Sequence, residues 1–393
     1  MVNRCSGLLT AILVITLSFN NIHAQTDTAA KLRIAVLAPL YIDSVFTDTD
    51  YTGGNVLPAN MLPGLDFYNG VMMAIDSLQK ENVPVEVWVY DTKKRMQNTA
   101  MLKAEMEDKH FSLIVAYLSG AMEQKDLGEF AFTHNIPLIS GTYPNDAGLS
   151  GNPYFAIVNP TLKTHTQAIY KYVHNVYFGS KVYYITKQGG MEQKIKSYFD
   201  EMKKNQTAFQ YTPVILPDNF KAADVLSQID STENGVIICG SLDEGFGTNL
   251  IKAINTSPAV KQLTVVGMPT WDAMNCLYNE DCKNVNLVYS TPYNYNRKNT
   301  LEALLSNKYR AMFKSRPSDM MFKGFEQMYH FTHLLLKYHD SLFSHLSDAS
   351  FKISNDYNFQ PVRLSATSYV PDFLENKKLY FIKMLGGSVK AVN

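Results

Sequence analysis

Short apolar runs alternate with amphipathic stretches along most of the chain. Residues 33–39 and 85–90 are rich in apolar, β-branched and aromatic side chains, which is typical of strands inside a sheet. Between them, residues 65–78 repeat apolar side chains at helical spacing, which predicts a helix with one buried face. Strands that alternate with helices in this way predict an α/β protein with parallel sheets covered by helices.

The same pattern continues to the C-terminus and predicts two groups of strand–helix units. Further strands are expected at residues 111–117, 136–140, 181–185, 211–215, 235–239, 263–266 and 286–289. Two consecutive helices, at 301–314 and 318–339, and a hairpin over 378–391 follow them. One sheet with all of these strands would be large, so two sheets in two lobes are the better interpretation. A loop over residues 41–63 follows the first strand, and loops of this length usually have a function or move.

The N-terminal segment has the features of a secretory signal. Arg4 precedes an apolar run, residues 8–19, that is too short to span a bilayer well, and Ala24 provides the small residue that signal peptidase needs. We therefore expect residues 1–24 to be removed on export to the periplasm; the alternative is an uncleaved anchor. Cys5 precedes the apolar run, so it is not the lipidated cysteine of a lipoprotein. No later apolar segment has the length of a membrane-spanning helix, so no membrane insertion is expected after signal removal.

Charge and motif content narrow the class of function. The chain carries 36 Lys and Arg and 36 Asp and Glu, so it has no basic excess for nucleic acid. It contains no G-x-S-x-G or H-E-x-x-H motif and no Cys/His constellation, which favours a binding protein over an enzyme. His330 and His333 lie one helical turn apart, as metal ligands can. No third ligand accompanies them, and no metal or other cofactor is predicted.

Three cysteines remain once the signal is removed. Cys276 and Cys282 flank a short polar loop, and an oxidising compartment permits them to pair, so we expect a disulfide between them. Cys239 ends the apolar run 235–239 and is interpreted as a buried thiol. A metal site is the alternative, but the chain has no C-x-x-C pair to support it.

The order of elements resembles the type I periplasmic binding proteins, the leucine/isoleucine/valine-binding family. The matching segments are residues 33–39, 64–78, 88–92, 114–120, 136–142, 154–160 and 287–292. The resemblance covers the chain from about Lys31 to the C-terminus. It implies two Rossmann-like lobes with parallel sheets, joined by three crossover segments. The first lobe would contain residues 31–157 and 292–355, and the second residues 158–291 and 356–393.

The resemblance also implies a ligand site between the lobes. In the amino-acid binders of this family, hydroxyls and backbone amides of two first-lobe loops hold the ligand carboxylate. An acid and aromatic side chains of the second lobe hold the remainder of the ligand. The residues that we expect to contact a ligand are Ser119, Gly120, Thr142, Tyr143, Gln188, Ser241, Thr270, Trp271 and Tyr293.

The chain departs from the family pattern at two positions. Gly120 stands where the family has a second Ser, and residues 267–271 stand where it has the second-lobe acid. Asp272, or Asp243 with Glu244, are the residues that would substitute for that acid. The ligand is therefore described as an amino acid or a related small polar molecule.

The candidate contacts also have structural alternatives. Ser119 and Thr142 are equally suited to capping a helix or a turn. Trp271 is expected to stack on the ligand from the second lobe, and its alternative is a position in the core. Tyr293 and Tyr295 either line the cleft or pack the hinge.

The function that the resemblance implies is capture of a small polar ligand by closure of two lobes, followed by delivery to an ABC permease. Each lobe then supplies part of the contacts, and the ligand favours the closed state. One alternative is a sensor or cell-envelope protein that passes its ligand state to a membrane receptor. The other is an enzyme, which would convert its bound compound.

Overall fold

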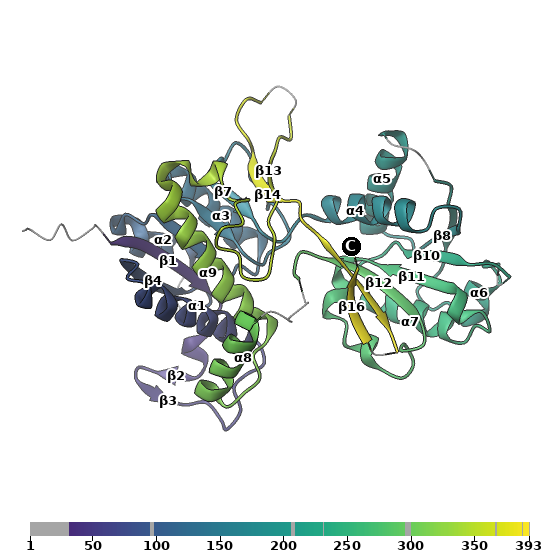
Figure 1. Ribbon diagram of the computed structural model, residues 1–393, viewed down its shortest axis with the longest axis horizontal. Coiled ribbons are helices and arrows are strands. Elements are labelled where there is room, and N and C mark those ends of the chain that lie inside the picture. The colour runs from purple at the N-terminus through teal and green to yellow at the C-terminus, as the bar shows by residue number, and fades with distance from the viewer. Residues whose placement is uncertain are drawn as a thin grey trace, which may run out of the picture.

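The computed structural model describes residues 31–94, 98–205, 209–230, 232–294, 300–365, 368–386 and 388–392. The predicted signal segment, residues 1–24, and Tyr295 lie outside the described residues. Within the described part of the chain the strands form two large sheets, one in each of two lobes that stand side by side (Figure 1). The predicted fold class, two α/β lobes with mainly parallel sheets, is confirmed.

The sheet of the first lobe is built around β1, whose Ile34–Ala38 segment is fully buried. Its strand order is β13-β14-β7-β6-β5-β1-β4. All neighbours pair in parallel except β13 and β14, which are antiparallel. The strands are β1 (Leu32–Ala38), β4 (Val85–Asp91), β5 (Leu113–Ala116), β6 (Leu138–Ser140), β7 (Phe155–Ile157), β13 (Phe359–Val362) and β14 (Phe373–Asn376).

Helices cover both faces of this sheet. On one face α1 (Leu62–Lys80) and α9 (Asp319–Tyr338) share a core with β1 and β5, and α8 (Thr300–Phe313) joins them. On the other face lie α2 (Thr99–Met106) and α3 (Ala121–Thr133). Helices α1 and α9 approach closely because glycines stand where they cross. A side-chain carbon on Gly324 would overlap the carbonyl oxygen of Phe67, and one on Gly70 would overlap that of Met321.

The second lobe has a sheet with the order β16-β15-β12-β11-β10-β8-β9. Its strands are β8 (Lys181–Thr186), β9 (Thr212–Ile215), β10 (Gly235–Cys239), β11 (Leu263–Gly267), β12 (Asn286–Thr291), β15 (Tyr380–Leu385) and β16 (Ser388–Val392). One face is covered by α4 (Leu162–Val176) and α5 (Gly190–Asn205). The other is covered by α6 (Ala222–Leu226) and α7 (Glu244–Asn255). The predicted C-terminal hairpin is β15 with β16, and it pairs antiparallel to β12.

The predicted boundary at residue 356 is wrong for the segment that follows α9. Strands β13 and β14 belong to the first sheet, where Leu374 pairs with Ala156 of β7. Only β15 and β16 belong to the second sheet. The reason is that β13 is a half-exposed edge strand and β14 buries polar residues, so neither shows the apolar run of a central strand. The chain enters the second lobe for the last time after Asn376.

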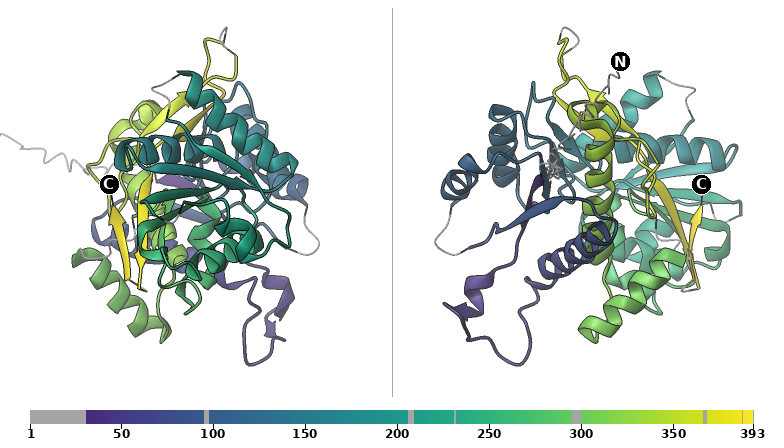
Figure 2. Two further views of the ribbon diagram at one scale, coloured as in Figure 1. Left: turned by 90° about the vertical axis from the view of Figure 1, so that its right-hand side faces the viewer. Right: turned by 60° about the vertical axis from the view of Figure 1, so that its left-hand side comes forward.

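The chain crosses between the lobes at three places. The first crossing joins β7 to α4, the second follows β12, and the third joins β14 to β15. The long loop after β1 contains a short 3₁₀ helix, Ile42–Ser44, and a small hairpin of β2 (Phe46–Thr47) with β3 (Asp50–Tyr51). This hairpin extends away from the body of the first lobe (Figures 1 and 2).

Candidate ligand-binding cleft

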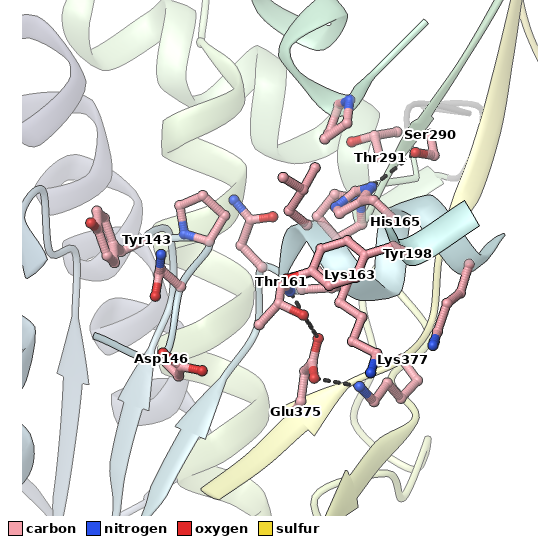
Figure 3. A pocket seen from close by; sticks show the side chains of 18 of the residues that line it. Tyr143, Asp146, Thr161, Lys163, His165, Tyr198, Ser290, Thr291, Glu375 and Lys377 are labelled. Atoms are coloured by element: carbon pink, nitrogen blue, oxygen red, sulfur yellow. Dashed lines mark hydrogen bonds and ion pairs between the residues drawn. The ribbon is translucent and has the colours of Figure 1, made fainter. Parts of the chain in front are cut away.

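A cleft with a volume of about 780 Å³ lies between the lobes, beside the three crossings (Figure 3). A volume of this size is ordinary for a site that binds a small molecule. First-lobe loops, the crossing segments, the start of α4 and the first turns of α5 all line it. Its polar and charged lining residues include Tyr143, Asp146, Thr161, Lys163, His165, Lys194, Tyr198, Thr270, Asp272, Ser290, Thr291, Tyr293, Lys323, Arg363, Glu375 and Lys377.

Glu375 links two of the crossings at one side of the cleft. Its buried carboxylate accepts hydrogen bonds from the backbone N–H of Thr161, at 2.8 Å, and from the hydroxyls of Thr161 and Thr164, at 2.9 and 2.6 Å. The ammonium of Lys377 donates to the same carboxylate. Because Thr161 is the N-cap of α4, the carboxylate also faces the positive end of that helix dipole. Strand β14 of the first lobe is thereby tied to the first helix of the second.

The next residue, Asn376, also links the first and third crossings. Its side-chain amide is fully buried and donates to the carbonyl oxygen of Val158 at 3.0 Å. Its side-chain oxygen accepts from the backbone N–H of Asn358 at 3.0 Å and of Lys378 at 3.1 Å. The first and third crossings are therefore held together by buried polar contacts rather than by apolar packing alone.

Tyr293 occupies the second crossing. Its hydroxyl donates to the carbonyl oxygen of Gly141 at 3.1 Å, and the side-chain amide of Gln327 donates to the same oxygen at 3.2 Å. The ammonium of Lys323 lies 3.6 Å from the centre of its ring, which is within the range of a cation–π contact. Burial raises the pKa of the Tyr293 hydroxyl, so it stays protonated and acts as a donor. Tyr293 both packs the hinge and lines the cleft.

His165 is a lining residue that the sequence did not single out. It lies in the first turn of α4 and is buried, and its Nδ1 lies 2.8 Å from the hydroxyl oxygen of Ser290 on β12. Burial lowers the pKa of the imidazole to about 3, so the ring is neutral at pH 7. Its Nε2 has no hydrogen-bond partner within the described part of the chain. The sequence could not have indicated that His165 lines the cleft, because a histidine in an amphipathic helix belongs to no binding motif.

Three of the predicted contacts line the cleft, namely Tyr143, Thr270 and Tyr293. Thr270 donates to the carbonyl oxygen of Leu242 at 3.3 Å, so its hydroxyl oxygen can still accept a hydrogen bond. Asp272, one of the alternatives for the second-lobe acid, lines the cleft as well and accepts from the hydroxyl of Thr291 at 3.2 Å. A carboxylate of the second lobe therefore lies in the cleft lining.

The hydroxyls of Ser119 and Thr142, which were predicted to contact the ligand from the first lobe, form hydrogen bonds within that lobe and do not line the cleft in this structure. The hydroxyl of Thr142 donates to the carbonyl oxygen of Leu118 at 2.9 Å. The backbone N–H of Ser119 donates to the carboxylate of Glu123 at 2.9 Å, and its hydroxyl lies 3.4 Å from the same oxygen. Gly120 is the N-cap of α3. These contacts match the local roles that were the alternative for Ser119 and Thr142.

Ser241 and Gln188 also lie outside the cleft lining. Ser241 is fully buried, and its hydroxyl donates to the carboxylate of Glu192 at 2.7 Å while accepting from the backbone N–H of Asp243 at 3.1 Å. This burial excludes direct contact with a ligand in the cleft. Gln188 is exposed in the turn between β8 and α5.

The prediction that Trp271 forms an aromatic wall of the cleft is wrong. Its side chain is only 1% exposed and belongs to the core beneath α7. The 3₁₀ helix Pro269–Ala273 turns the indole back over β11, where it covers Gly267 and Gly247. Side-chain carbons at Gly267 would overlap the ring, so the glycine provides the space that the indole fills. The neighbours Thr270 and Asp272 face the cleft in its place.

The predicted disulfide is not formed in the structure. Cys239, Cys276 and Cys282 are all free thiols. Cys276 and Cys282 are neighbours within hydrogen-bonding reach, and the hydroxyl of Thr248 lies 3.1 Å from the sulfur of Cys276. Burial raises the pKa of the Cys239 thiol to about 12 and that of Cys282 to about 11, so both are protonated at pH 7.

Two features are absent from the residues that the structure describes. No group of three or more His, Cys, Asp and Glu side chains within them is arranged to hold a metal ion. No helix within them combines the length and apolar character needed to cross a membrane.

Comparison with known proteins places the chain in a family. The profile of the family described as "Periplasmic binding protein" matches residues 58–344. The chain therefore belongs to the periplasmic binding protein family, and the resemblance found in the sequence is confirmed at this level. No curated protein sequence matches the chain.

Solved structures share the fold over nearly the whole chain. A putative branched-chain amino acid ABC transporter protein from Rhodospirillum rubrum has a TM-score of 0.65 at 12% identity, over 92% of this chain and 100% of that one. An ABC transporter substrate-binding protein from Desulfitobacterium hafniense in complex with Leu has a TM-score of 0.58 at 12% identity, with the same coverage. The leucine-binding protein LivK from Thermotoga maritima has a TM-score of 0.52 at 12% identity, over 92% and 98%.

Proposed function

We propose that the protein is exported and captures a small polar ligand, an amino acid or a related molecule, between its two lobes. The observation that carries this proposal is a cleft of about 780 Å³ with polar groups from both lobes beside three crossings. A ligand that contacts both walls stabilises the closed arrangement relative to the open one. Membership of the periplasmic binding protein family and the names of the structural neighbours support this function.

The lining residues divide into two walls with a floor between them. Tyr143 belongs to the first lobe, Thr270 and Asp272 belong to the second, and His165 with Tyr293 forms part of the floor. Ser119, Gly120, Thr142 and Gln188 stand in loops at the carboxyl ends of strands, where ligands of open α/β sheets bind. We expect these four to approach the ligand when the lobes close. Binding of this kind needs no covalent chemistry, and delivery to an ABC-type permease would complete the transport function.

Native mass spectrometry of protein purified from the periplasm without denaturation tests the proposal. The expected result is one small molecule bound per chain, released intact by partial unfolding. Conversion of that molecule during incubation would instead show an enzyme. A ligand that stays bound when Asp272→Asn and Thr270→Val are combined would show that the cleft is not its site.

A further inference from the structure

The cleft is basic although the chain as a whole is neutral. Lys and Arg together number 36 in the sequence, equal to Asp and Glu. Among the described residues that line the cleft, the cations are Lys163, Lys194, Lys323, Arg363 and Lys377, and the carboxylates are Asp146, Asp272 and Glu375. The excess of positive charge is thus a property of this site.

Most of these cations already have a partner. Lys163 pairs with Glu201 at 2.9 Å. Lys377 pairs with Glu375, as Figure 3 shows. Lys323 lies over the ring of Tyr293. Lys194 and Arg363 differ, because neither side chain forms an ion pair or a hydrogen bond with any residue in the described ranges of the chain.

The two unpaired cations lie on opposite walls. Lys194 lies in the second turn of α5 in the second lobe, and Arg363 directly follows β13 of the first lobe. Closure of the lobes brings like charges toward each other and removes water between them, which opposes closure unless an anion is present. An anionic group between Lys194 and Arg363 would attract both cations, so their charges would then favour closure instead of opposing it. The guanidinium of Arg363 also offers the paired donors that suit a carboxylate.

We propose that the ligand is anionic, a small carboxylate-bearing molecule with a net negative charge, and that one carboxylate lies between Arg363 and Lys194 in the closed state. This inference rests on the proposed function, since it assigns a ligand class to the same cleft. Acidic amino acids fit this class: their second carboxylate would meet the two cations, and their ammonium would meet Asp272 on the second lobe. Aliphatic amino acids such as leucine have no second carboxylate to place between the two cations.

Titration calorimetry on the mature protein, after extensive dialysis, tests the inference with defined probes. L-Glutamate and L-aspartate are compared with L-glutamine, L-asparagine and L-leucine, and with inorganic phosphate. We expect an acidic amino acid to bind at least about tenfold more tightly than its amide, because an ion pair in a closed cleft is charge-assisted and poorly screened.

Substitutions at the two cations complete the test. Arg363→Gln and Lys194→Gln should each weaken binding of the acidic probe about tenfold or more, while the amide probes bind these variants as they bind the unaltered protein. Lys171→Gln, on an exposed position of α4 outside the cleft lining, is the matched control and should leave every affinity unchanged. Both cleft cations are exposed, so the melting temperature of each variant should match that of the unaltered protein.

Several results would overturn the inference. One is leucine or an amide binding as tightly as the acidic amino acids; another is acidic-probe affinity that neither substitution alters. Tight binding of phosphate alone, or binding by none of the probes, would contradict the assignment to carboxylates of this size. A neutral molecule found by native mass spectrometry would overturn the anionic ligand but leave the proposed function intact. An empty protein that binds no small molecule would contradict both.

Discussion

The carboxylate of Glu375 and the N-cap residue Thr161 join the first and third crossings between the lobes. Glu375 accepts from both the backbone N–H and the hydroxyl of Thr161, at 2.8 and 2.9 Å. It lies on a strand of the first lobe, and Thr161 begins a helix of the second. A contact of this kind links the two lobes at the hinge.

Replacement of Glu375 by Gln should destabilise the protein by about 2–4 kcal/mol, because it removes a buried carboxylate that accepts three hydrogen bonds and leaves the half-buried ammonium of Lys377 without its counter-charge. Urea unfolding followed by circular dichroism measures this change. Glu201→Gln is the control, since Glu201 pairs with Lys163 at an exposed position and should contribute less than about 1 kcal/mol. Equal effects of the two substitutions would show that Glu375 has no special role at the hinge.

His165 should make the protein less stable in mild acid. Its pKa is about 3 in the folded protein against 6.5 for an ordinary histidine, so the folded state binds fewer protons than the unfolded state. The stability that neutral His165 contributes is fully present above pH 6.5 and is lost as the pH falls from there toward 3. By pH 5 the loss amounts to about 2 kcal/mol.

His165→Gln should therefore lose less stability between pH 7.5 and pH 5 than the unaltered protein does. Part of the acid loss should remain in the variant, because burial also lowers the pKa of His330, to about 4. Urea titrations at the two pH values give the comparison. Identical pH dependence in the two proteins would mean that His165 is hydrated and titrates normally.

Truncation of Trp271 to Ala should cost about 3–5 kcal/mol of stability, since the indole is 1% exposed and fills the space over two glycines. Tyr278→Ala, at a side chain that is 63% exposed, should change stability by less than about 1 kcal/mol. Calorimetric melting distinguishes the two. An unchanged melting temperature together with weakened ligand binding would show that Trp271 contacts the ligand rather than packing in the core.

The crossing of α1 and α9 should not tolerate a methyl group. Gly324→Ala places a carbon against the carbonyl oxygen of Phe67 and should destabilise by about 1–3 kcal/mol, although alanine favours a helix. Gly54→Ala is the control, because no atom lies within 4 Å of the added carbon. The idea fails if unfolding of the Gly324 variant requires as much urea as that of the control.

The apolar periodicity was sufficient to predict the central strands, because buried parallel strands such as β1 and β10 are continuously apolar. It failed for β13 and β14, an edge strand and a strand with buried polar residues. Glu375 illustrates the cause. A charged residue is expected to be exposed, and the partners that allow Glu375 to be buried, Thr161 and Thr164, are distant in the sequence.

The site was predicted only in part for a related reason. Sequence order places residues 267–272 at the exit of a strand, but it does not determine that Trp271 turns inward while Thr270 and Asp272 turn toward the cleft. His165 and Arg363 carry no motif, and their positions follow from how the two lobes face each other. Such tertiary placement has no signature in local spacing.

Closure of the two lobes on a ligand is the central claim, and small-angle X-ray scattering measures it most directly. The radius of gyration is recorded for the dialysed protein and for the same protein saturated with the molecule that native mass spectrometry identifies. We predict a smaller radius in the bound state, with no change in oligomeric state and with the secondary structure unchanged by circular dichroism. An identical scattering profile with and without saturating ligand would contradict the account.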